Sequence, residues 1–139
     1  MKTTKIKTAL ISTCLTVTVL IMLAGSIQAQ SNNQLDGVKR ERAVKSIISN
    51  FTSVSAGIRE ASIKYAGEYK LTETEDALIG LLKKNDEPST KILIANSLLM
   101  IGDEKGIDAI RTAASNENDQ SVKEVFARVV NEFEKTKKY

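Results

Sequence analysis

The stretch that decides the fold is 89–114, which reads STKILIANSLLMIGDEKGIDAIRTAA. Its first half, up to Ile101, is apolar on nearly all sides, and this is typical of a helix covered by neighbours all round. Between the halves, Asp103 follows Gly102 and can cap a second helix. That helix carries apolar residues at the spacing of a single face: Ala109, Ile110, Ala113 and Ala114. The stretch therefore predicts a helix, a tight turn and another helix.

Four further stripes at helical spacing extend this pattern to both sides. They consist of Ala43, Val44, Ile47, Ile48 and Phe51; of Ile58, Ser62, Tyr65, Ala66 and Tyr69; of Ala77, Leu78, Leu81 and Leu82; and of Val122, Phe126, Val129, Val130 and Phe133. Thr72 and Glu75 have the spacing of a capping box, and Pro88 suits the first turn of a helix. The sequence predicts six helices joined by short turns.

The helices repeat in pairs along the chain. The first helices match at shifts of 34 and 32 residues, from Ala43 to Ala77 to Ala109. For the second helices, the set of Ser62, Tyr65 and Ala66 is matched to Ala95, Leu98 and Leu99 at a shift of 33, and then to Phe126, Val129 and Val130 at a shift of 31. A helix pair recurring at this period is typical of an α-solenoid, in which each hairpin is buried by its neighbours. We expect a repeat domain over 35–136, with repeats at about 35–69, 71–102 and 103–136.

The repeats resemble the HEAT and HEAT-like family. The resemblance is carried by Ile58-Arg59 and Val122-Lys123, and by Ala95, Leu98-Leu99 and Ile101-Gly102-Asp103 followed by Ile107 and Ala109-Ile110. It covers about Val38 to Phe133 and departs from the family pattern at Lys91 and Asn131. It implies an all-α, right-handed solenoid of about three hairpins, with an acid–base ladder along the turns between Asp86 or Asp119 and Lys91 or Lys123. An irregular helical bundle is the alternative fold, whereas turns that break the heptads exclude a coiled coil.

The first 29 residues have the three parts of a secretory signal peptide. A short basic start with Lys2, Lys5 and Lys7 precedes the uncharged run from Thr8 to Leu23, and small residues then lead to Ala29. Cleavage there would leave 30–34 as a disordered lead-in and would make the protein periplasmic or secreted. Since no charge lies between Lys7 and Asp36, an uncleaved membrane anchor is the alternative.

Composition removes most catalytic and ligand-binding classes. The chain has no histidine, and its only cysteine, Cys14, lies in the leader, so the rest cannot form a Ser-His-Asp triad, a histidine zinc site or a disulfide. The net charge of +3 equals the three lysines of the leader, so no basic domain remains for nucleic acid. Acidic residues at the expected helix starts suit the helix dipole. We expect no enzyme activity, no cofactor and no metal.

These observations favour an exported protein-interaction module, and we expect it to be a monomer that binds another protein or peptide. The resemblance implies that the second helix of each pair lines the concave side and binds the partner. Counting along these helices gives the candidate contact residues Glu60, Lys64, Leu93, Asn96, Met100, Glu124, Arg128 and Asn131, together with Ile63, Ser97 and Ala127. Leu93 and Met100 would supply contact area, and Lys64, Asn96 and Arg128 specificity. Alternatively Ile63, Leu93 and Met100 pack between repeats; a membrane-tethered scaffold and a HEAT-like lyase or cofactor-handling protein are the other functions considered.

Overall fold

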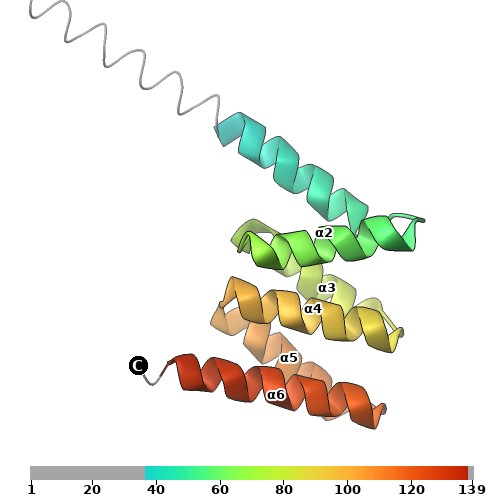
Figure 1. Cartoon of the computed structure of the whole chain (residues 1–139), viewed down its shortest axis with the longest axis vertical. Helices are drawn as coiled ribbons and strands as arrows, with labels where there is room; N and C mark the ends of the chain where they lie inside the picture. Colours follow the sequence, from blue (N-terminus) through green and yellow to red (C-terminus); the bar gives the residue numbers. More distant parts are fainter. Residues whose placement is uncertain (1–36, 138–139) are drawn as a thin grey trace, which may run out of the picture. The chain divides into compact units, whose positions relative to one another are not determined.

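The computed structural model describes residues 37–137 (Figure 1). The expected signal peptide at 1–29 and the lead-in at 30–34 lie outside the described residues. The repeats below belong to the compact unit that begins at Arg42. Within 37–137 no helix is both long enough and apolar enough to cross a membrane.

The described residues form six α-helices and no strand, as the sequence predicted. A helix over 37–50 is followed by α2 (Ala56–Glu68), the short 3₁₀ helix η1 (Thr72–Thr74), α3 (Glu75–Lys84), α4 (Pro88–Ile101), α5 (Glu104–Asn116) and α6 (Gln120–Thr136). Within the unit that begins at Arg42, these helices make three hairpins: 42–50 with α2, α3 with α4, and α5 with α6.

Local chemistry explains where most helices begin and end. Pro88 occupies the first turn of α4, where its missing N–H costs no hydrogen bond. Gly102 ends this helix with a φ of 80°, a left-handed conformation that glycine adopts without strain. The Asp103 carboxylate then accepts a hydrogen bond from the Lys105 N–H at 3.1 Å. The predicted cap of α5 is thereby confirmed.

The capping box predicted at Thr72 and Glu75 is wrong. Residues Thr72–Thr74 form η1, and α3 begins only at Glu75. The Thr74 hydroxyl donates to the Leu71 carbonyl at 2.8 Å, and no side chain caps α3. Glu75 is buried instead of reaching back to its own helix start. A side chain at a helix start can turn toward a neighbouring repeat, and the local sequence does not reveal this.

The hairpins stack into two layers of helices. The second helices form one layer, in which α4 contacts α2 on one side and α6 on the other. In the other layer α3 contacts α5, and both contact α4. The core between the layers includes the fully buried Ile63, Leu78, Leu98, Ile110 and Phe126. Leu98 is fully buried, whereas Leu99 is only half-buried. The fold is an all-α solenoid of three hairpins.

The second helices are related by a constant spacing of 32 residues. Their N-cap residues are Ser55, Glu87 and Asp119, which differ by 87 − 55 and 119 − 87. The middle member of the predicted alignment is therefore wrong by one residue: Ser62, Tyr65 and Ala66 correspond to Ile94, Ser97 and Leu98. The correspondence to Phe126, Val129 and Val130 holds. Because α4 is apolar on nearly all sides, side-chain similarity alone could not fix its phase.

Candidate interaction surface

The exposed face of the α2–α4–α6 layer carries a row of three polar side chains, which we call the Lys64 row. Lys64, Asn96 and Arg128 occupy equivalent positions, 32 residues apart, and all three are exposed. Because α4 lies between α2 and α6, the row crosses three neighbouring helices. The structure thus brings together the three residues that the sequence assigned to specificity.

Acidic residues border this row one helical turn away on either side. On α2 and α6 the order along the helix is acidic, basic, acidic: Glu60, Lys64 and Glu68, then Glu124, Arg128 and Glu132. On α4 the same three positions are Ile92, Asn96 and Met100. The surface therefore has an apolar and amide centre with a charged border, as is typical of a protein interface.

The remaining predicted contact residues lie in different surroundings. Met100 is exposed, whereas Leu93 is half-buried and packs against the core, so it offers little contact area. Ile63 is buried in the core, in agreement with the alternative that it packs between repeats. Ser97 is buried against α2, so its prediction as a surface residue is wrong. Asn131 and Ala127 are exposed on the side of α6 away from α4, outside the row.

A groove of about 320 Å³ lies beside the row, between α4 and α6. Asn96 and Arg128 stand at this groove, together with Ile92, Leu99, Val125, Val129 and Glu132. The apolar members were not predicted as surface residues: Leu99 and Val129 were assigned to helix faces of the core, and Val125 to none. Leu99 and Val125 do pack in part against the core. The groove offers an apolar floor next to one amide, one guanidinium and one carboxylate group, which can bind an apolar side chain and both acceptors and donors of hydrogen bonds.

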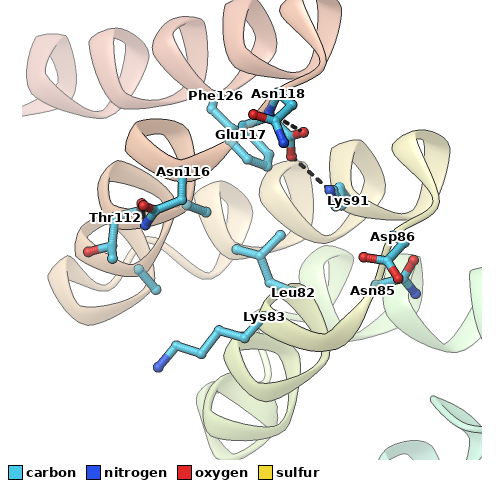
Figure 2. A pocket seen from close by; sticks show the side chains of 12 residues that line it. Leu82, Lys83, Asn85, Asp86, Lys91, Thr112, Asn116, Glu117, Asn118 and Phe126 are labelled. Atoms are coloured by element: carbon cyan, nitrogen blue, oxygen red, sulfur yellow. Dashed lines mark hydrogen bonds and ion pairs between the residues drawn. The ribbon is translucent and has the colours of Figure 1, made fainter.

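A second hollow, of about 340 Å³, lies near the α5–α6 turn (Figure 2). Here Lys91 Nζ contacts Glu117 Oε2 at 2.8 Å, and the Glu117 side chain is only 8% exposed. Glu117 Oε1 also accepts the backbone N–H groups of Asn118 and Asp119. The hydrogen bond from Lys91 lowers the pKa of Glu117, and the Asp119 amide lowers this pKa further. These contacts hold the turn, so we assign them to structure and not to binding.

The expected acid–base ladder is therefore present in a different form. Lys91 pairs with Glu117, not with Asp86 or Asp119. In α2 the equivalent Arg59 donates to the carbonyl oxygens of Ser53 and Val54. Asp119 serves instead as the N-cap of α6, accepting the N–H groups of Ser121 and Val122 at 2.8 and 3.2 Å. The resemblance indicated the right turns, but only the packed helices show which acid each base can reach.

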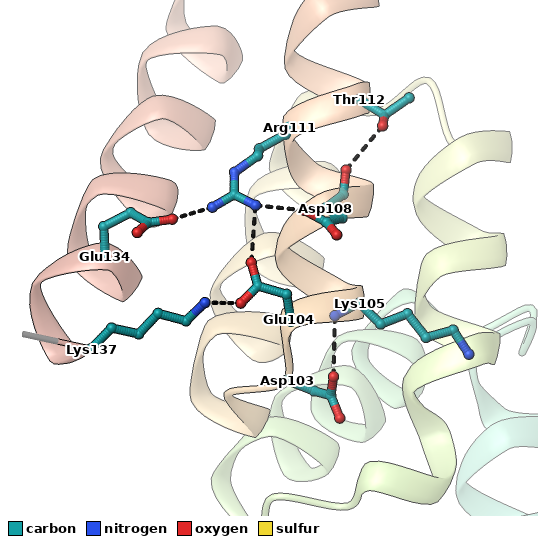
Figure 3. A network of polar contacts seen from close by, with 8 residues as sticks. All are labelled: Asp103, Glu104, Lys105, Asp108, Arg111, Thr112, Glu134 and Lys137. Carbon is teal, nitrogen blue, oxygen red and sulfur yellow. Dashed lines mark hydrogen bonds and ion pairs between the residues drawn. The ribbon is translucent and has the colours of Figure 1, made fainter.

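A polar network closes the third hairpin at its C-terminal end (Figure 3). Arg111 on α5 contacts Glu104, Asp108 and Glu134, and Lys137 contacts Glu104 as well. Hydrogen bonds from Lys137 and Arg111 lower the pKa of Glu104. Its members are 23 to 33 residues apart across the two helices, so no local motif pointed to it. Because the network ties α5 to α6, it supports the helix that bears Arg128.

One buried acid stands apart from these surface groups. Glu75 Oε1 is buried and has no hydrogen-bond partner among the described residues. Burial raises the pKa of Glu75, the charge of Asp103 raises it further, and the backbone of Gly106 offsets part of the shift. A Cβ at Gly106 would lie 2.9 Å from Glu75 Oε1, so glycine makes room for this carboxyl. No group of three side chains that could hold a metal occurs in 37–137.

Comparison with known proteins gives one family. A family model of HEAT repeats matches residues 38–131. No curated protein and no solved structure matches the chain significantly. The matched residues include α2, α4 and the part of α6 up to Asn131, and therefore the whole Lys64 row.

Proposed function

Because the chain belongs to the HEAT repeat family, we propose that it is an exported, non-catalytic module that binds another protein or peptide on the exposed face of α2, α4 and α6. HEAT repeats commonly mediate protein–protein interaction, and the family is generally a non-catalytic scaffold. The residues available for chemistry agree with this role, since the chain contains no histidine and its only cysteine is Cys14.

The observation that carries the proposal is the Lys64 row beside the α4–α6 groove. Asn96 and Arg128 both stand at the groove, and Met100 is one of few large apolar side chains exposed nearby. A fitting partner places an apolar side chain in the groove and a carboxylate against Arg128. Charge-assisted hydrogen bonds from arginine to carboxylate are stronger than neutral ones and depend on direction, so this contact would select the partner.

A double substitution tests this surface. Asn96→Arg with Arg128→Glu changes two exposed side chains: it places a carboxylate where the guanidinium of α6 was and moves the positive charge to α4. Thr112→Arg with Ser115→Glu is the matched control, since both residues are exposed on α5, in the other layer. A partner captured from the exported fraction is identified by mass spectrometry, and its binding to each purified variant is titrated. We expect binding to weaken at least about tenfold in the first variant only. Equal binding by both variants, with intact folding, would reject this surface.

Export is proposed from the leader. Its basic start, apolar run and small exit residues support cleavage after Ala29, whereas the charge-free interval up to Asp36 supports a membrane-tethered scaffold. Mass spectrometry of the protein recovered from cells separates the two. A chain beginning at Gln30 supports the exported form, and a chain retaining Met1–Ala29 in the membrane fraction supports the tethered form.

A further inference from the structure

In α4 and α6, the residues that face the preceding repeat occupy the same three positions of the helix. In α4 these are Thr90, Ser97 and Ile101, and all three are buried where α4 contacts α2. The approach is close: a Cβ at Gly67 of α2 would lie 2.7 Å from the Ser97 Cα. The equivalent residues of α6, 32 positions later, are also buried: Val122, Val129 and Phe133. This flank of a second helix is thus the one that packs on the preceding repeat.

In α2 the same positions are open and apolar. Ile58, Tyr65 and Tyr69 are 48%, 45% and 61% exposed. The rings of Tyr65 and Tyr69 stack with centroids 4.1 Å apart. Val54, just before the helix, is fully exposed, and Ala61 between them is exposed too. We call these five residues the N-terminal stripe. Three of them, Ile58, Tyr65 and Tyr69, occupy positions that are buried in both other repeats. Exposed apolar residues that lie together in this way indicate an interface.

The opposite edge of the stack has a different chemistry. On α6 the positions that would meet a following repeat are Lys123, Ala127 and Asn131, and all three are exposed. In α4 the equivalent residues are Lys91, Ala95 and Leu99, which are buried or half-buried. Head-to-tail stacking of two chains would press the N-terminal stripe onto a lysine and an asparagine. Such a contact would bury unpaired polar groups, and it would also leave an open edge for further copies.

We propose that the N-terminal stripe binds the same stripe of a second copy of this chain, forming a two-fold symmetric dimer. The spacing supports this pairing, because the stripe is nearly symmetric about Ala61. Ile58 lies three residues before it and Tyr65 four after, and Val54 lies seven before and Tyr69 eight after. Antiparallel α2 helices therefore place Ile58 against Tyr65 of the second copy, with the small Ala61 near the centre. Val54 and Tyr69 lie just beyond the two ends of the helix.

The chemistry of the stripe suits such a contact. Its five residues carry no charge, so a two-fold axis brings no like charges together. Exposed tyrosines contribute large contact areas and keep a polar hydroxyl at the rim, and this explains their enrichment in interfaces. The dimer does not rest on the proposed function, since the N-terminal stripe and the Lys64 row have no residue in common. Sequence analysis expected a monomer, because it did not distinguish the open flank of α2 from the buried flanks.

Sedimentation equilibrium tests the dimer, using protein expressed from the full coding sequence and purified in its processed form. Ile58→Glu with Tyr65→Glu places four carboxylates at the proposed interface, while Lys123→Glu with Asn131→Glu makes a matched change at the opposite edge. We expect a wild-type dimer whose dissociation constant rises at least about tenfold in the first variant and stays unchanged in the second. A monomeric wild type at about 100 μM, or assembly lost only in the second variant, would overturn the proposal.

Cross-linking provides a test that does not depend on the charged variant folding. Ala61→Cys, in a Cys14→Ser background, places the new thiol beside the two-fold axis, and Ala127→Cys is the control at the opposite edge. We expect oxidation to give a disulfide-linked dimer with Ala61→Cys alone. Equal yields from both variants would indicate random collision. If no dimer forms and the stripe of the monomer is protected from hydroxyl-radical labelling, then residues before Gly37 or another protein cover the stripe. This outcome would also overturn the proposal.

Discussion

The two edges of the repeat stack differ although they derive from the same repeating unit. At the α6 edge, Lys123 and Asn131 occupy positions that are buried or half-buried in α4, and both are polar and exposed. At the α2 edge, Ile58, Tyr65 and Tyr69 occupy positions that are buried in α4 and α6, and yet they remain apolar and exposed. The α6 edge is therefore polar, as a solvent-exposed end of the stack requires, whereas the α2 edge is apolar and suited to a further contact.

This difference shows how a repeat protein controls its length. Terminal repeats need a polar outer face, since an apolar one invites another repeat or another molecule. The third hairpin meets this need, and its Arg111 network also ties α5 to α6. The first hairpin does not meet it on α2. Paired substitutions at equivalent positions can show whether burial, rather than residue type, separates the two edges.

The largest expected contrast is between Phe133 and Tyr69, which occupy equivalent positions on α6 and α2. Phe133→Ala removes a buried ring that also contacts Lys137, with 4.9 Å between its centroid and the lysine Nζ. We expect the free energy of unfolding to fall by about 3–5 kcal/mol. Tyr69→Ala removes an exposed ring, so a loss below about 1 kcal/mol is expected. Urea unfolding at low protein concentration measures both, and equal losses would contradict the contrast between the edges.

A smaller effect is expected at the α2–α4 contact. Gly67→Ala brings a Cβ to within 2.7 Å of the Ser97 backbone, so the two helices must separate, and we expect a loss of about 1–3 kcal/mol. Gly80→Ala is the control on α3, because a Cβ there meets no atom within 4 Å. Higher helix propensity should then stabilise the protein by about 0.5–1 kcal/mol. Thermal melting compares the two, and a Gly67→Ala protein as stable as wild type would mean that the helices approach less closely.

The smallest effect concerns Glu75, within the first-helix layer. Its pKa is raised by burial, so the folded protein binds a proton more tightly than the unfolded chain does. Stability is therefore greatest below the ordinary pKa of 4.5 and falls as the pH rises through the raised value. We expect Glu75→Gln to be more stable than wild type at neutral pH, with the advantage disappearing in acid.

Urea unfolding across a pH series measures this advantage, with Glu60→Gln as the exposed control on α2. An advantage for Glu75→Gln that is independent of pH would show that the carboxyl group is already protonated, or is hydrated, throughout the range. An increase in its advantage toward acid would contradict the sign of the shift.

The helices were predictable because their signals are local. Apolar residues at a spacing of three or four define one helix face, and Pro88, Gly102 and Asp103 act on backbone groups within a turn of themselves. The prediction of a capping box was wrong because the position of the Glu75 side chain depends on a residue far away in the sequence. Glu75 has the right spacing to cap its own helix, but a neighbouring repeat offers its side chain a place beside Gly106.

The candidate site was predictable in part. Lys64, Asn96 and Arg128 were chosen from sequence and do lie in one row, because long polar side chains off the core stripe are rarely buried without a partner. Ser97, a small polar residue of α4, was chosen as a surface residue and is buried. An error of one residue in the register of α4 rotates its assigned face by about 100°, which is enough to exchange surface and interior.

The sequence by itself determined the helices, their pairing into repeats and the family to which the chain belongs. These follow from periodicity and caps, which involve residues within a few positions of each other. The tertiary structure alone decided the phase of α4, the partner of Lys91, the α4–α6 groove and the open flank of α2. Each of these depends on which surfaces of two helices meet, and that choice is made by close packing between residues about 30 positions apart.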